Sequence, residues 1–332
     1  ENSFPGTTLR PASPVPVVPA RFSFLPQARI PERQELAPSR LDKVAETWEM
    51  SNHKDGSSIV INGEYKGLSF SEYLEKKGKT VWGKNCEKYD NFPIMIKFID
   101  AKQALSIQVH PDDEYALKNE GEFGKNEFWY VLEAEPDAFL YYGVNQEMTK
   151  EEFRQHIEDD TVCDYLKKVP IKKGDCFYIK AGTIHAIGAG SVIAEIQQCS
   201  NSTYRVYDFG RLGADGKPRE LHIDKAVDVS CLVPSEKNGD PEGTIEELDG
   251  YTKLLLTDND YFTCERYDVT KSYNGQAGLD SFQALTILNG EGTITYDDKT
   301  LDIKKGDSVF IPAQEGAYQV NGEVSFIKTF VR

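Results

Sequence analysis

The sequence has fewer basic than acidic residues, 38 against 54, only five histidines and no long apolar run. The shortage of basic charge and of apolar runs argues against nucleic-acid-binding and membrane-spanning proteins. The formal net charge of −16 argues against nucleic acid or an anionic membrane as a partner, because both require a basic face. No apolar run approaches the roughly 20 residues that a membrane-spanning helix needs. The N-terminal residues lack a charged segment followed by an apolar one, so we predict no secretory signal.

The cysteines show no disulfide or metal-binding spacing. Six are present, far apart and without a CxxC motif: Cys86, Cys163, Cys176, Cys199, Cys231 and Cys264. Disulfide frameworks are typical of small secreted domains, whereas cytosolic proteins keep their thiols reduced. We therefore predict six reduced thiols and a cytoplasmic protein.

Short apolar runs separated by turn residues fill most of the chain and indicate a mainly β protein. Prolines recur in residues 1–40 and predict an irregular leader on the surface, with a recognition arm as the alternative. Residues 151–168 mix charged and apolar residues at helical spacing, which predicts one or two surface helices. A polar stretch at 234–250 indicates a boundary between a domain at 41–233 and a second one at 234–332.

One segment of the chain recurs. Residues 171–182 read IKKGDCFYIKAG and residues 303–313 read IKKGDSVFIPA; each is a Gly-Asp turn that feeds an apolar strand. This pattern is typical of a cupin hairpin. Two copies predict two cupin-like, jelly-roll β-barrels, with a small helical segment between strands of the first. Chance recurrence of a common turn is the alternative.

Two polar residues share one face of a predicted strand at 105–110. Side chains alternate along a strand, so Gln108 and His110 lie on one face and Ile107 and Val109 on the other. Polar groups on the inner face of a barrel need a partner, because burying them alone costs free energy. A metal ion is one such partner.

His185 and Glu127 complete a candidate ligand set. His185 follows the first Gly-Asp strand, and the same offset in the second copy gives Ala317, so the repeat keeps the hairpin and loses the imidazole. Glu127 opens an aromatic-rich strand, where it is either exposed or turned inward. Together with Gln108 and His110, these residues suit Zn²⁺ with one position left for water or substrate, and would also accept Mn²⁺, Fe²⁺ or Co²⁺.

The other three histidines carry no such pattern. His53 lies in a loop, His156 on a charged helical stretch, and His222 just before another predicted helix. We interpret each as a solvated or structurally bonded side chain.

Several long motifs resemble those of the type I phosphomannose isomerases, in the compact form without the large helical insert of the longer enzymes. They are LSIQVHPDD at 105–113, AGTIHA at 181–186, EIQQCSNSTYRVYD at 195–208, ETWEMS at 46–51 and PIMIKFIDA at 93–101. The resemblance runs from about residue 44 to the C-terminus. One departure is that the family's Arg-x-Trp-Gly-Gly segment has no counterpart in residues 1–40.

The resemblance implies roles for particular residues. The four ligand candidates would bind one zinc ion per chain. Arg205, Glu195 and Lys125 would lie in the active site, with Ser106 and Lys102 near the substrate. Arg205 is expected on the strand next to that of Glu195, across a turn at 201–202, and a structural ion pair between the two is the alternative reading.

The implied activity is the interconversion of mannose 6-phosphate and fructose 6-phosphate through an enediol. Such a reaction needs a base for the carbon-bound proton, which Glu195 would supply if burial raises its pKa. Another metal-dependent cupin enzyme, such as an oxygenase, and a non-catalytic sugar-phosphate-binding cupin are the rival readings. We expect a sugar phosphate as the ligand, no nucleic-acid or membrane partner, and a monomer or homodimer. The second domain is expected to lack metal ligands.

Overall fold

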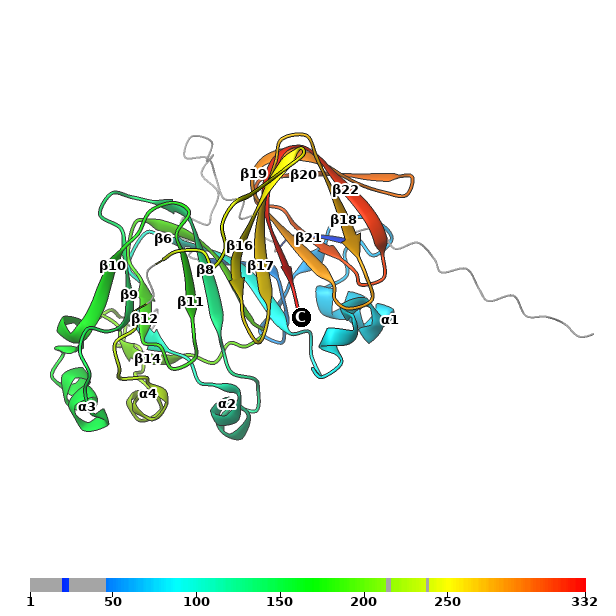
Figure 1. The fold of residues 1–332 in the computed structure, drawn as a ribbon. Helices are drawn as coiled ribbons and strands as arrows, with labels where there is room; N and C mark the ends of the chain where they lie inside the picture. Colours follow the sequence, from blue (N-terminus) through cyan, green and yellow to red (C-terminus); the bar gives the residue numbers. More distant parts are fainter. Residues whose placement is uncertain (1–19, 24–45, 213–215, 237–238) are drawn as a thin grey trace, which may run out of the picture.

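The computed structural model describes residues 20–23, 46–212, 216–236 and 239–332. The chain is mainly β, as predicted, and forms two β-rich halves that lie side by side (Figure 1). In the part of the chain that is described, no helix combines the length and the apolar character needed to cross a membrane. The structure has all six cysteines as free thiols.

The first half consists of two five-stranded antiparallel sheets. One has the order β10-β9-β12-β7-β14 and the other the order β11-β8-β13-β6-β2. The strands are β2 (Glu46–Met50), β6 (Ile94–Ala101), β7 (Ile107–Val109), β8 (Glu127–Ala134), β9 (Phe139–Val144), β10 (Leu166–Pro170), β11 (Cys176–Ile179), β12 (His185–Ile187), β13 (Ser191–Gln198) and β14 (Tyr204–Tyr207). Buried side chains of both sheets, such as Leu140 from one and Trp129 and Ile193 from the other, form one core cluster between them.

The second half is a ten-stranded antiparallel sheet. Its strands are β1 (Ala20–Ser23), β5 (Ile59–Val60), β15 (Glu246–Leu248), β16 (Tyr251–Asp258), β17 (Thr263–Val269), β18 (Ser272–Ala277), β19 (Gln283–Tyr296), β20 (Lys299–Lys304), β21 (Ser308–Ile311) and β22 (Gly316–Phe330). A separate hairpin joins β3 (Asn52–His53) to β4 (Gly56–Ser57). A large apolar cluster, to which Phe128 and Phe98 contribute from the first half and Phe282 and Ile327 from the second, holds the halves together.

Helices are few and short. They are α1 (Phe70–Lys77), α2 (Asp113–Asn119), α3 (Lys150–Glu158) and α4 (Ile223–Val229), with 3₁₀ turns at Lys79–Trp82, Lys84–Cys86 and Val162–Tyr165. The predicted helical stretch contains α3, which a capping box between Thr149 and Glu152 starts. The end of that stretch was predicted wrongly: its last residues belong to β10, which pairs with β9.

Two segments differ from the predicted domain plan. Residues 20–23 lie in the leader predicted to be irregular, yet they form β1, which pairs with β21 and β5; these four residues include no proline. The rest of residues 1–40 lies outside the described residues. Residues 59–92 fall within the predicted first domain but pack on the second half: the Phe70 ring lies 5.3 Å from that of Phe310, and α1 lies beside that half in Figure 1.

The recurring segment adopts the same structure twice. Gly174 and Gly306 both have a positive φ, 95° and 86°, which favours glycine. In each turn the aspartate that follows accepts a hydrogen bond from a lysine backbone N–H three residues earlier, at 2.9 Å for Asp175 and 2.7 Å for Asp307. The shared geometry supports an interpretation as a structural repeat.

The repeat extends to a group of three charged residues, built around a buried pair, whose signs are reversed between the halves. On neighbouring strands of the first half, Lys97 lies opposite Glu195 and its Nζ is 3.5 Å from the carboxylate; Glu46 lies 3.9 Å from the same Nζ. At the equivalent register of the second half, Glu265 lies opposite Lys328. Its carboxylate is 2.9 Å from the Nζ of Lys328 and 2.9 Å from that of Lys253.

Replacing Lys328 with methionine is expected to lower the free energy of unfolding by about 3 kcal/mol, because it leaves a buried carboxylate short of one partner. Lys305→Met breaks a solvent-exposed pair with Glu133 and is the matched control, with an expected effect below about 1 kcal/mol. Urea denaturation of both variants measures the difference. Equal effects would show that the buried pair contributes no more than a surface one.

A candidate metal and active site

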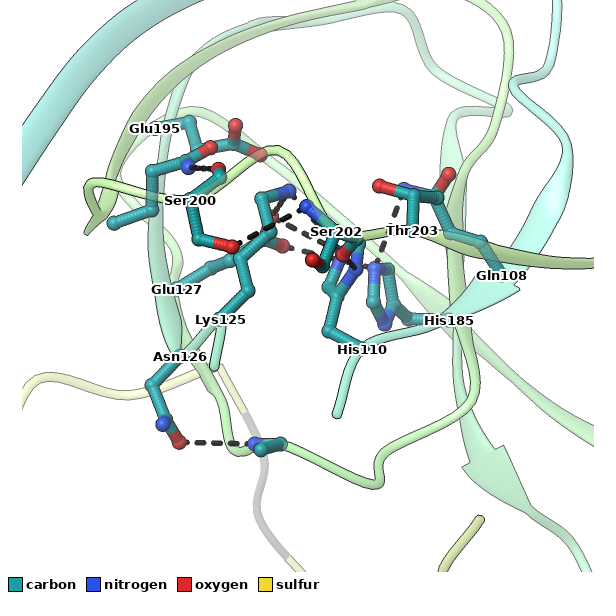
Figure 2. A network of polar contacts seen from close by, with 12 residues as sticks. Gln108, His110, Lys125, Asn126, Glu127, His185, Glu195, Ser200, Ser202 and Thr203 are labelled. Carbon is teal, nitrogen blue, oxygen red and sulfur yellow. Dashed lines mark hydrogen bonds and ion pairs between the residues drawn. The ribbon is translucent and has the colours of Figure 1, made fainter. Parts of the chain in front are cut away.

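Three buried side chains converge on the inner side of the first half (Figure 2). His110 follows β7, Glu127 begins β8 and His185 begins β12. One potential ligand atom from each lies within 4.8 Å of the others. Gln108 joins them, since it lies opposite His185 across β7 and β12 with the amide nitrogen 3.4 Å from the imidazole Nε2. The structure therefore brings all four predicted ligands together.

Backbone carbonyls fix the tautomer of both imidazoles. The Nδ1–H of His110 donates to the Ser202 carbonyl at 2.9 Å, and that of His185 donates to the Thr183 carbonyl at 2.8 Å. Each Nε2 therefore carries its lone pair toward Glu127, at 3.2 Å for His110 and 3.6 Å for His185. Burial lowers the pKa of His110 to about 3 and also lowers the pKa of His185, so both rings are neutral, the form that binds metals.

Glu127 supplies the negative charge of the group. Burial by itself would raise its pKa, but the Lys125 ammonium holds that pKa well below its usual range. Its Oε2 is buried and has no hydrogen-bond partner among the described residues. A buried carboxylate oxygen without a partner, facing two imidazole lone pairs, fits a divalent cation.

Lys125 is part of the same group. Its Nζ donates to the Glu127 carboxylate and lies 3.2 Å from Nε2 of His110. The side chain is buried, so its positive charge is weakly screened there. Negative charge on a substrate oxygen would be stabilised beside it.

Glu195 lies on β13, next to β8 in the same sheet as Glu127 and within its electrostatic range. It occupies the middle of β13, where Trp129 Nε1 donates to its carboxylate at 2.8 Å and the Lys97 Nζ lies 3.5 Å away. Burial and the charge of Glu127 raise the pKa of Glu195, against the opposing effects of Lys125 and Lys97. A carboxylate with a raised pKa is a suitable base for a carbon-bound proton.

Sequence reasoning missed Lys97. Its side chain is buried, and its Nζ also lies 5.0 Å from the centre of the Trp48 ring. A signal was available: in the strand at 93–101, alternation puts Lys97 on the same face as Met95 and Ile99, so a charged residue stands in an otherwise apolar row. A lysine there requires a buried negative partner, which Glu195 provides.

Arg205 lies opposite Gln108, on a different strand from the one expected. It belongs to β14, which pairs with β7 and places Arg205 opposite Gln108. Glu195 belongs to the other sheet, so the prediction of neighbouring strands was wrong, and Glu195 is paired with Lys97. The turn at 201–202 crosses from one sheet to the other. The Nη1 of Arg205 donates to the Glu220 carbonyl at 2.8 Å, while its Nε is buried without a partner among the described residues.

The two predicted substrate-binding residues differ in position. Ser106 is buried and precedes β7, two residues before Gln108, on the face that alternation assigns to the ligands. Lys102 is exposed and follows the end of β6 that pairs with Ser191, whereas Glu127 lies at the Gln197 end of the same sheet. The structure therefore does not bring Lys102 to the site, because β6 carries it to the far end of the sheet.

Two facing β-sheets with buried imidazoles and a carboxylate on their inner side define a class, the cupin-type proteins that can hold a metal ion inside a β-barrel. The chain is 37% identical to the mannose-6-phosphate isomerase of Streptococcus mutans, over 86% of this chain and 88% of that protein. It is 38% identical to mannose-6-phosphate isomerase ManA of Bacillus subtilis, over 84% and 87%. The chain belongs to the type I phosphomannose isomerase family.

Two further comparisons agree with this assignment. The family described as phosphomannose isomerase type I, catalytic domain, matches residues 29–141, and the mannose-6-phosphate isomerase cupin domain matches residues 252–331. The crystal structure of the mannose 6-phosphate isomerase from Bacillus subtilis aligns with a TM-score of 0.79 at 36% identity, covering 86% of this chain and 89% of that one. The predicted resemblance is confirmed.

Proposed function

We propose that this protein is a metal-dependent aldose–ketose isomerase that interconverts mannose 6-phosphate and fructose 6-phosphate through an enediol. The observation that carries the proposal is the position of Glu195, a buried carboxylate with a raised pKa, on the strand next to that of Glu127 and beside the His110, Glu127 and His185 group. A base and a metal site that share one interior meet the two main needs of the reaction.

The proposed site residues fall into two sets, the metal ligands and the groups that act on the substrate. Gln108, His110, Glu127 and His185 would hold one ion, and the donor set of two imidazoles, a carboxylate and an amide favours Zn²⁺. When bound, the ion would polarise substrate oxygens as a Lewis acid. The identity of the ion is part of the proposal.

Glu195 would take the proton from one of the two adjacent substrate carbons and return it to the other. Lys97, 3.5 Å from its carboxylate, opposes the rise of its pKa and so favours the ionised form that acts as a base. Arg205 and Lys125 would stabilise negative charge on the substrate oxygens, and Ser106 would hydrogen-bond a phosphate oxygen. These positive groups give an acidic protein a local site for an anionic substrate. The proposed compartment is the cytoplasm, and the proposed assembly is a monomer or homodimer.

A coupled assay with mannose 6-phosphate tests the proposal. We expect turnover that stops on chelation and returns when Zn²⁺ is added back, because the proposed reaction needs the ion to polarise the substrate oxygens. Elemental analysis should give about one divalent ion per chain, as a single four-ligand site requires. Sugar-phosphate binding without turnover would favour a non-catalytic cupin, and a requirement for iron and oxygen would favour an oxygenase.

A further inference from the structure

A chain of hydrogen bonds leads from the predicted metal ligand His110 to a buried histidine outside the site. The Nδ1–H of His110 donates to the backbone carbonyl of Ser202 at 2.9 Å. The hydroxyl of the same serine donates to Oε1 of Glu122 at 2.6 Å. The other carboxylate oxygen of Glu122 lies 3.1 Å from Nε2 of His53.

The tautomer of His53, at the far end of this chain of hydrogen bonds, sets the proton positions along it. The backbone N–H of Asp55 donates to Nδ1 of His53 at 3.2 Å, so Nε2 carries the hydrogen and donates to Glu122. The His53 side chain is 6% exposed and that of Glu122 is 20% exposed. Hydrogen bonds from Ser202 and His53 lower the pKa of Glu122 against the effect of burial, so the carboxylate is ionised and accepts at both oxygens.

We propose that Glu122 and His53 are positioning residues for the metal ligand His110, acting through Ser202. The proposal rests on the metal site of the proposed function. The Ser202 carbonyl orients the His110 ring, and this carbonyl lies in a segment without regular secondary structure between β13 and β14. Because no ladder of backbone hydrogen bonds holds that segment, side-chain anchors decide where the carbonyl points.

The second imidazole provides an internal comparison. The carbonyl that orients His185 belongs to Thr183, two residues earlier in the same turn, so its position is fixed locally. The carbonyl that orients His110 lies 92 residues away in the sequence, and its anchor Glu122 comes from a third segment. Of the two imidazoles, therefore, only that of His110 is oriented by residues distant in the sequence.

Zinc affinity measured directly tests the proposal. The protein is stripped with a chelator and titrated with Zn²⁺ against a chromophoric competitor. Glu122→Ala is expected to weaken Zn²⁺ binding about 10- to 100-fold, the usual effect of removing a group that supports a metal ligand. Glu122→Gln keeps an oxygen for the Ser202 hydroxyl and is expected to restore part of the affinity.

Two further variants separate positioning from general stability. Glu120→Ala is the matched control, because Glu120 bonds to Tyr204 and Lys225 and not to Ser202, so its Zn²⁺ affinity should equal that of the unaltered protein. Ser202→Ala removes the hydroxyl but leaves the carbonyl, and is expected to weaken binding as Glu122→Ala does. Melting curves of the metal-free proteins show whether each variant folds. If Glu122→Ala does not fold, the Zn²⁺ affinity of Ser202→Ala tests the proposal instead.

The outcomes are distinct. Unaltered Zn²⁺ affinity in the folded Glu122→Ala or Ser202→Ala variant would overturn the positioning role and leave the proposed isomerase standing. An equal loss of Zn²⁺ affinity in Glu120→Ala would also overturn the positioning role, because a general loss of stability in this region would then explain the effect. Failure of the unaltered protein to bind Zn²⁺ would remove the metal site, and both proposals with it.

Discussion

Replacing His185 with alanine is expected to reduce bound metal from about one ion per chain to nearly none and to abolish turnover. The imidazole is fully buried, its Nδ1–H is fixed by the Thr183 carbonyl, and its Nε2 lies 3.6 Å from Glu127. Removing it leaves two strong ligands and an amide, too few for a tight zinc site. Elemental analysis and the coupled assay measure the two effects.

The repeat supplies the matched control for this variant. Ala317 holds the position of His185 in the second half, where it lies opposite Gln276 as His185 lies opposite Gln108. Ala317→Ser should leave metal content and turnover nearly unchanged, because we propose no metal site there. Full metal occupancy in His185→Ala would remove that residue from the site, and loss of activity in Ala317→Ser with the fold intact would give the second half a part in the chemistry.

Replacing Glu195 with glutamine is expected to lower kcat about 10²- to 10⁴-fold, the range that general acid–base catalysis contributes. The amide has nearly the same shape and still accepts the hydrogen bond from Trp129, so zinc content should change little. The melting temperature should fall, because buried Lys97 loses its negative partner. Steady-state kinetics together with elemental analysis separates loss of the base from loss of the metal. A variant with normal kcat would rule out Glu195 as the base.

Glu49→Gln is the control for burial of the carboxyl. Glu49 is also buried and its pKa is raised to about 7, chiefly by burial, but alternation on β2 puts it on the face opposite to Glu46 and Trp48. The charge of Asp307, in the second half, also raises the pKa of Glu49, so Glu49 faces the second half and away from the site. Turnover of this variant should remain close to normal.

The raised pKa of Glu195 also predicts a pH dependence. The base acts only when ionised, so kcat/KM should fall as the pH drops through a value above 4.5, the ordinary pKa of glutamate. Lys97 opposes the rise, so Lys97→Met should move this acid limb to higher pH. An acid limb that does not move would show that another group controls it.

Local patterns in the sequence determined which residues could form the site. Strand alternation placed Gln108 and His110 on one face, and the repeated Gly-Asp hairpin singled out His185 by its replacement with Ala317. The family motifs identified Glu127 and Glu195. Strand faces can be inferred in this way because the face depends only on residues two positions apart, whatever the strand pairs with.

Only the tertiary structure decided which strands and loops meet. It placed Arg205 beside Gln108 instead of beside Glu195, and carried Lys102 away to the other end of the sheet. It also gave Lys97 its buried partner and gave His53 a path to His110 through Glu122 and Ser202. The hydrogen-bonded register of distant strands, and the loops that register brings together, follow from how the whole core packs, and no local pattern records that.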